Sequence, residues 1–180
     1  MVHSLIGKPA PTFSAMDTNG KTYNFTTGGG VPTVLFFYPK AGSMGCIREV
    51  SQLQTLTEKD SFKQARVRMV GVSADSVEKQ KEFAKKQKLT YPILSDRGGK
   101  ARRAYSIGRF LFWPSTRTTF IIDKAGTIRA ILDATVNNGA HAKFVDKELD
   151  KLRAEEGNAQ SLKQAFSTDV NASTYAIPAV

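Results

Sequence analysis

Residues 33–46 read Thr33-Val-Leu-Phe-Phe-Tyr-Pro-Lys-Ala-Gly-Ser-Met-Gly-Cys46 and join a continuous apolar run to a turn that contains proline and glycine. The apolar run predicts a strand that is buried on both faces. After Cys46 the apolar residues recur at a spacing of three, which indicates a helix: Ile47, Val50, Leu53 and Leu56. Cys46 should therefore lie in the first turn of a helix at the carboxyl end of a buried strand, where α/β sheets bind ligands.

The sequence on either side of this stretch predicts an α/β fold with a central mixed sheet, helices on both faces and an N-terminal β-hairpin. Strands are expected over residues 12–16, 21–25, 33–38, 67–73, 117–123 and 127–132, and residues 91–94 form a short extended piece. Helices are expected over residues 46–59, 76–88, a short basic segment ending near Tyr105, and Ala140–Glu156. We expect one domain over residues 1–156 and a loosely ordered tail over residues 157–180, where the apolar pattern fades.

Cys46 is the only cysteine of the chain, and a single cysteine is most often a small buried hydrophobe. Its neighbours favour a reactive thiolate instead. Ser43 places a hydroxyl one helical turn before the sulfur, and Pro39 can shield the sulfur from water at the end of the strand. Glu49 lies on the same helix face, where a carboxylate opposes a thiolate unless a cation stands between them. Arg117, directly ahead of a buried strand, is the candidate cation, although it could instead be a surface residue.

With these residues the chain resembles the peroxiredoxins, and among them the peroxiredoxin Q (bacterioferritin comigratory protein) subfamily. The subfamily pattern Pro-x-x-x-Thr/Ser-x-x-Cys is present as Pro39, Ser43 and Cys46, and its following Glu as Glu49. The distal pattern Arg-Ser/Thr-Thr-Phe-x-x-Asp is present at residues 117–123. The resemblance spans residues 5–155 and leaves the C-terminal tail without a counterpart.

The resemblance implies a thioredoxin-like fold and thiol-dependent reduction of hydrogen peroxide and organic hydroperoxides, without a cofactor, in antioxidant defence and redox homeostasis. Cys46 would attack the peroxide as a thiolate and become a sulfenic acid. Ser43 and the Cys46 N–H would hold the peroxide oxygens, and Arg117 would stabilise the thiolate and the leaving oxygen. Pro39 would exclude water, and Glu49 would fix the guanidinium of Arg117.

The chain departs from the subfamily at Ser51, where many members carry a resolving cysteine. Because no second cysteine exists, an intramolecular disulfide is impossible and the sulfenic acid must be reduced by an external thiol. This one-cysteine mechanism leaves the reductant open among glutathione, glutaredoxin and thioredoxin. Basic residues between Arg97 and Arg117 could guide an acidic reductant. The alternative is a thioredoxin-fold redox sensor or chaperone-like binding protein with little turnover.

The composition limits the remaining classes of function. The 180 residues carry a net charge of +10, but the basic helices lack a motif of stacking aromatic residues, so nucleic acid is not favoured as a partner. No apolar run reaches the roughly 20 residues that a membrane helix needs. The chain start lacks an export segment, and the single cysteine fits a reducing compartment. We therefore expect a cytoplasmic protein, and the charge is also compatible with the nucleus.

Two further features bear on metals and partners. The two histidines, His3 and His141, lie far apart in the sequence without a cluster of other ligands, so no metal site is expected. Residues 110–113, Phe-Leu-Phe-Trp, form either a plug in the core or an exposed patch for a substrate or a second subunit. A monomer is favoured, and this patch leaves a dimer open.

Overall fold

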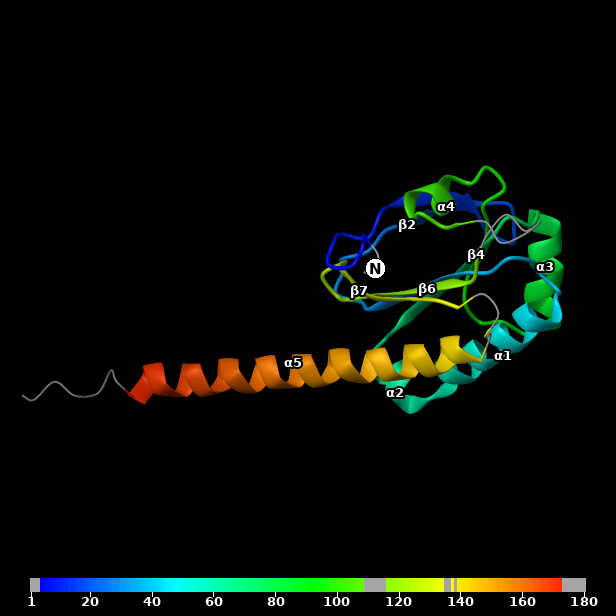
Figure 1. The fold of residues 1–180 in the computed structure, drawn as a ribbon. Coiled ribbons are helices and arrows are strands. Elements are labelled where there is room, and N and C mark those ends of the chain that lie inside the picture. The colour runs from blue at the N-terminus through cyan, green and yellow to red at the C-terminus, as the bar shows by residue number, and fades with distance from the viewer. Residues whose placement is uncertain (1–3, 109–115, 135–136, 138, 173–180) are drawn as a thin grey trace, which may run out of the picture. The chain divides into compact units, whose positions relative to one another are not determined.

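The structure is a computed structural model that describes residues 4–108, 116–134, 137 and 139–172 (Figure 1). Its elements follow in the order β1 (Phe13–Met16), β2 (Thr22–Phe25), β3 (Thr33–Phe37), α1 (Met44–Glu58), α2 (Asp60–Gln64), β4 (Arg68–Ser73), α3 (Val77–Lys86), β5 (Ile93–Ser95), α4 (Lys100–Ala104), β6 (Thr118–Ile122), β7 (Ile128–Asp133) and α5 (Ala140–Ala172). The sequence did not predict helix α2, and it indicated the region of β5 only as a short extended piece.

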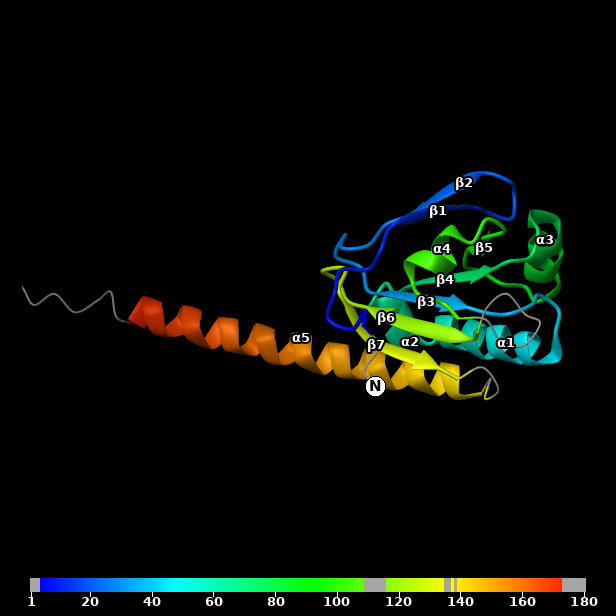
Figure 2. The same cartoon turned by 45° about the horizontal axis from the view of Figure 1, so that its top comes forward.

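The strands form one sheet in the order β2-β1-β5-β4-β3-β6-β7. Strands β3, β4 and β5 are parallel, whereas β6 pairs with β3 in the antiparallel sense. Helices α1 and α2 lie on one side of the sheet and α4 lies on the other (Figures 1 and 2). The predicted α/β class, the mixed sheet and the N-terminal hairpin are confirmed.

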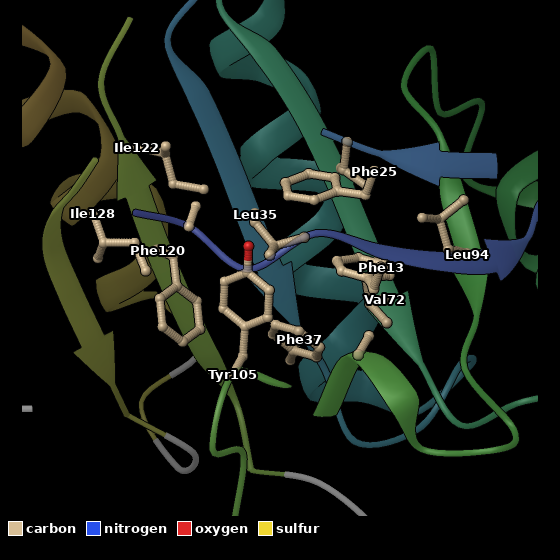
Figure 3. Close-up of a cluster of buried hydrophobic side chains, with 13 residues drawn as sticks. Phe13, Phe25, Leu35, Phe37, Val72, Leu94, Tyr105, Phe120, Ile122 and Ile128 are labelled. Carbon is tan, nitrogen blue, oxygen red and sulfur yellow. The ribbon is translucent and has the colours of Figure 1, made fainter. Parts of the chain in front are cut away.

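The central strand β3 is buried along its whole length, as its apolar sequence predicts. Successive side chains of a strand point to opposite faces, so Leu35 and Phe37 enter the cluster of buried side chains shown in Figure 3. Tyr105 is at the centre of this cluster, with ring centroids 4.9 Å from Phe120 and 5.6 Å from Phe37. Aromatic burial of this size dominates core energetics and fixes the position of β3, which leads directly to Cys46.

The chain divides into two compact units, residues 1–146 and residues 147–180, and α5 contributes to both. The sequence predicted that this helix ends near Glu156, but it continues to Ala172. Alanine, glutamine, leucine and lysine in this stretch have high intrinsic helix propensity, which apolar periodicity does not reveal. The domain boundary at residue 156 and a loosely ordered tail in solution stay predictions.

Residues 109–115, which contain the apolar segment Phe110–Trp113, lie outside the described residues, as does His3.

Candidate active site

Cys46 lies in the first turn of α1, which begins at Met44 after the N-cap Ser43. The loop of residues 38–43 joins it to the carboxyl end of β3, as the sequence predicts. The sulfur belongs to a fully buried residue and forms no disulfide. The first backbone N–H groups of a helix have no partner within it, and its positive dipole end favours a negative charge. The fold therefore places the thiol where its anion is stabilised.

Arg117 reaches Cys46 from the neighbouring strand. The register pairs Phe37 of β3 with Thr118 of β6, so Arg117 stands beside the loop that carries the cysteine. Its Nη2 donates to Cys46 Sγ at 3.4 Å, and its Nη1 donates to Glu49 Oε2. Burial lowers the pKa of Arg117, but the charges of Glu49 and Cys46 outweigh this effect and raise the pKa above its usual value. The guanidinium is a permanent buried cation.

Glu49 lies one turn after Cys46 on α1 and is buried with it. Burial raises the pKa of Glu49 to about 7, although the neighbouring Arg117 acts in the opposite direction. Its Oε2 is bonded to Arg117, whereas Oε1 has no hydrogen-bond partner among the described residues. Nδ1 of His141 lies 3.8 Å from Oε1. The carboxyl group can therefore change charge near neutral pH.

The structure brings together three of the predicted site residues, Cys46, Arg117 and Glu49, in one buried group. Pro39 is buried in the same loop. The hydroxyl of Ser43 is only partly buried and donates to the Lys40 carbonyl at 3.1 Å rather than to the cysteine. Ser43 would have to rotate away from this carbonyl in order to contact a bound peroxide.

Asp75, which no sequence pattern singled out, anchors the loop of residues 38–43. Its Oδ2 accepts hydrogen bonds from the Ala41 N–H at 2.6 Å and from the Ser73 hydroxyl at 2.8 Å. Within the same loop, the buried Tyr38 hydroxyl donates to Gln80. Asp75 follows β4 by two residues, and β4 is the parallel neighbour of β3. The rule that placed Cys46 at the carboxyl ends of parallel strands could have found it.

His141, in the first turn of α5, also belongs to the site. Thr119 of β6 bonds to its Nδ1 at 2.8 Å, and its Nε2 lies 3.1 Å from the Ala134 carbonyl oxygen. Burial, with a smaller effect of the Arg117 charge, lowers the pKa of His141 to about 4, against the raising effect of the hydrogen bond to the Ala134 carbonyl. No spacing rule links this histidine to Arg117, and from the sequence it was considered only as a metal ligand, a role that was not favoured.

The described residues hold neither a metal cluster nor a membrane-spanning helix. No group of three or more histidine, cysteine, aspartate and glutamate side chains is arranged to hold a metal ion within the described part of the chain. No described helix combines the length and apolar character needed to cross a membrane.

A thiol at the helix N-terminus that follows the parallel strand β3, in contact with a buried arginine that precedes the antiparallel strand β6, is the arrangement expected of a thiol-based oxidoreductase. The sequence pattern of the AhpC/TSA family matches residues 6–131, and the chain belongs to this family. It is similar to the chloroplastic peroxiredoxin Q of Gentiana triflora, with 34% identity over 82% of this chain and 66% of that protein. The chain thus spans about two thirds of the length of that relative.

Solved structures agree with this assignment. Peroxidoxin BcpB of Mycobacterium tuberculosis is 33% identical, with a TM-score of 0.73 over 84% of this chain and 98% of that one. The bacterioferritin comigratory protein of Xanthomonas campestris is 26% identical, with a TM-score of 0.68 over 79% of this chain and 91% of that one. The thioredoxin-like fold and the peroxiredoxin Q resemblance are confirmed, and peroxiredoxins are thiol-dependent peroxidases.

Proposed function

We propose that this peroxiredoxin reduces hydrogen peroxide and organic hydroperoxides by a one-cysteine mechanism centred on Cys46. The thiolate attacks one peroxide oxygen, the O–O bond breaks, and the other oxygen leaves as water or an alcohol after it takes up a proton. Cys46 is oxidised to a sulfenic acid. The observation that carries the proposal is the guanidinium of Arg117, which contacts both the Cys46 sulfur and the Glu49 carboxylate.

Each predicted residue has a physical role in this step. Arg117 stabilises the thiolate and the charge that develops on the leaving oxygen. Glu49 orients the guanidinium, and buried Pro39 keeps water from the sulfur. The Cys46 N–H and a rotated Ser43 hydroxyl hold the peroxide. Alkyl peroxide reduction is the activity described for the Xanthomonas campestris protein, which supports organic hydroperoxides as substrates here.

The catalytic cycle is completed by an external thiol in this proposal. Because Ser51 occupies the position of a resolving cysteine and no other cysteine exists, one reductant thiol displaces water from the sulfenic acid and forms a mixed disulfide. A second thiol then releases the Cys46 thiol and leaves as the oxidised disulfide. The candidate reductants remain glutathione, glutaredoxin and thioredoxin.

Steady-state peroxide consumption tests the proposal with each reductant in turn. Wild type and Ser51→Ala should turn over alike, whereas Cys46→Ser should be inactive. Peroxide consumption by Cys46→Ser at the wild-type rate would overturn the proposal. Consumption of one equivalent of peroxide per protein, followed by no turnover with any of the reductants, would instead identify a redox sensor or a chaperone-like binding protein.

The cellular setting follows from the same proposal. A peroxidase that depends on an external thiol works in a reducing compartment, so we propose a cytoplasmic protein in antioxidant defence, and its charge is compatible with the nucleus. The curated relative from Gentiana triflora is chloroplastic by name. We further propose a monomer, and sedimentation of the reduced protein tests this against a dimer.

A further inference from the structure

His141 belongs to no step of the reaction described above, although its whole residue is buried beside Glu49. Its Nε2 faces the Ala134 carbonyl oxygen at 3.1 Å, and a carbonyl can only accept a hydrogen bond. The proton of a neutral His141 therefore resides on Nε2, and Nδ1 presents a lone pair. This bond fixes the tautomer and the orientation of the ring.

Two groups compete for the lone pair on Nδ1. The Thr119 hydroxyl lies 2.8 Å away and can donate to it. Glu49 Oε1 lies 3.8 Å away, beyond hydrogen-bond distance, and is itself a buried oxygen without a partner among the described residues. A protonated Oε1 would become a donor to Nδ1, in which case the Thr119 hydroxyl has to turn away. The distances therefore correspond to the arrangement with an ionised Glu49.

We propose that His141 is a positioning residue that accepts the proton of Glu49 at Oε1 and so sets the charge that Glu49 presents to Arg117. Protonation occurs on Oε1, the oxygen of Glu49 that does not contact Arg117. The negative charge of Glu49 is thereby removed while Arg117 stays in place. The guanidinium charge is then directed to Cys46 rather than divided between two anions. The inference rests on the proposed reaction of Cys46 with peroxide.

The surroundings of the pair are consistent with a proton held between Glu49 and His141. In the described structure, Arg117 ahead of β6 acts on both members of the pair, Tyr91 ahead of β5 experiences the charge of Glu49, and Cys46 on α1 contacts the same guanidinium. Arg117 remains a cation, and burial raises the pKa of Tyr91, whose hydroxyl donates to the Val50 carbonyl at 3.2 Å. Protons can therefore be exchanged near neutral pH by Glu49 without a change at Arg117 or Tyr91.

Two conservative variants should move this ionisation in opposite directions. His141→Gln retains an N–H for the Ala134 carbonyl but replaces the imidazole nitrogen that accepts from Glu49 by a weaker amide-oxygen acceptor, so Glu49 should ionise at a pH lower by about one unit. Thr119→Val keeps the shape of the strand residue but removes the competing hydroxyl, so Glu49 should ionise at a higher pH. The readout is the pH profile of the second-order rate of Cys46 oxidation by hydrogen peroxide in a single turnover.

Glu49→Gln should abolish the inflection in the pH profile of Cys46 oxidation, which assigns that inflection to Glu49. The double variant Glu49→Gln with His141→Gln should then show the same pH profile as Glu49→Gln alone. NMR titration of the His141 ring nitrogens supplies a readout that is independent of activity, with His3→Ala for assignment. We expect the chemical shift of Nδ1 to change in one step near neutral pH, and we expect Glu49→Gln to remove this step. An Nδ1 signal that does not change near neutral pH contradicts the proposal. So does an inflection of the rate profile that moves equally in His141→Gln and Thr119→Val. Absent peroxide oxidation with a normal NMR step would instead contradict the proposed function.

Discussion

At the scale of single residues, the guanidinium of Arg117 decides the chemistry because it contacts the Cys46 sulfur and the Glu49 carboxyl group at once, both of them buried. Nη2 donates to Cys46 Sγ at 3.4 Å while Nη1 is bonded to Glu49. A lysine ammonium is a point charge and cannot span both partners with a fixed planar fork. The geometry therefore depends on arginine rather than on any cation.

We expect Arg117→Lys to lose most of the rate of Cys46 oxidation, by about 100-fold, which is the scale of one electrostatic stabiliser of a transition state. Arg117→Ala should lose more, and it also leaves Glu49 as a buried carboxyl without its cation. Single-turnover peroxide oxidation measures the rate, and urea unfolding measures the free energy of unfolding. A wild-type rate in Arg117→Lys would show that a positive charge alone is sufficient.

Glu49 and His141 should affect stability with opposite pH dependence. The pKa of Glu49 is raised to about 7 in the folded protein, so its contribution to stability is present below the unfolded value near 4.5 and is lost as pH rises through 7. The pKa of His141 is lowered to about 4, so its contribution is present above the unfolded value near 6.5 and is lost as pH falls through 4.

The two contributions can be separated by urea unfolding between pH 4 and 8. Relative to Glu49→Gln, wild type should gain up to about 3 kcal/mol as pH falls from 8 to 4.5. Relative to His141→Asn, wild type should lose up to about 3 kcal/mol as pH falls from 7 to 4. Slopes of the same sign for the two variants would refute this assignment.

At the scale of elements, the sequence predicted β3 and the start of α1 because each follows from local patterns, whereas the approach of Arg117 across 71 residues was expected from the need for a cation beside Cys46 and from the family resemblance. An apolar run and a period of three are visible in the sequence, as is the place of Arg117 ahead of a buried strand, but not the contact that it makes. Asp75 and His141 escaped prediction because their role depends on which segments meet in space. Asp75 bonds to the Ala41 N–H across 34 residues, and Thr119 bonds to His141 across 22.

The loop of residues 38–43 should lose its position when its anchor is changed. Asp75→Asn keeps the size of the side chain, but its amide nitrogen cannot accept from the Ala41 N–H and its oxygen is a weaker acceptor than a carboxylate. We expect peroxide oxidation of Cys46 to slow by about tenfold, which corresponds to roughly 1.4 kcal/mol. Single-turnover oxidation by hydrogen peroxide measures this rate.

Asp123→Asn is the matched control for Asp75→Asn. Asp123 accepts backbone hydrogen bonds from Ala125 at 3.0 Å and Thr127 at 2.9 Å in the turn between β6 and β7. The Asp123→Asn substitution should lower thermal stability without slowing the oxidation of Cys46 by peroxide. Equal losses of rate in both variants would mean that the loop anchor acts only through general stability.

Helix α1 should oppose a resolving cysteine introduced at Ser51. Five residues of a helix rise about 7.5 Å and turn through roughly 140° beyond a full circle, which places Cys46 and residue 51 on different faces and too far apart for a disulfide. In Ser51→Cys, the disulfide should therefore form more slowly than the sulfenic acid, because α1 must first unwind locally. Mass spectrometry of alkylated samples along the reaction measures both species. A disulfide formed as fast as the sulfenic acid would mean that α1 is already unwound before oxidation.

At the scale of the whole molecule, the net charge of +10 is distributed differently from what the sequence suggested for residues 97–117. Arg117 is buried at Cys46, and Arg102 forms an ion pair with Asp96 at 3.0 Å. Exposed basic side chains in this region are Arg97, Lys100 and Arg103 within the described residues. The surface that remains can attract an acidic partner over a distance set by the ionic strength, because the Debye length is about 10 Å at 0.1 M salt.

Reduction of the Cys46 sulfenic acid by an acidic protein thiol should therefore slow several-fold between low salt and roughly 0.5 M salt, since long-range attraction acts on the association rate. Reduction by uncharged dithiothreitol should be unchanged over the same range, because no charge is screened. Arg97→Glu with Lys100→Glu should weaken the salt dependence for the acidic protein and leave the rate with dithiothreitol at its wild-type value. If this charge-reversed pair retained the full salt dependence, the attraction would have to arise from basic residues elsewhere on the molecule.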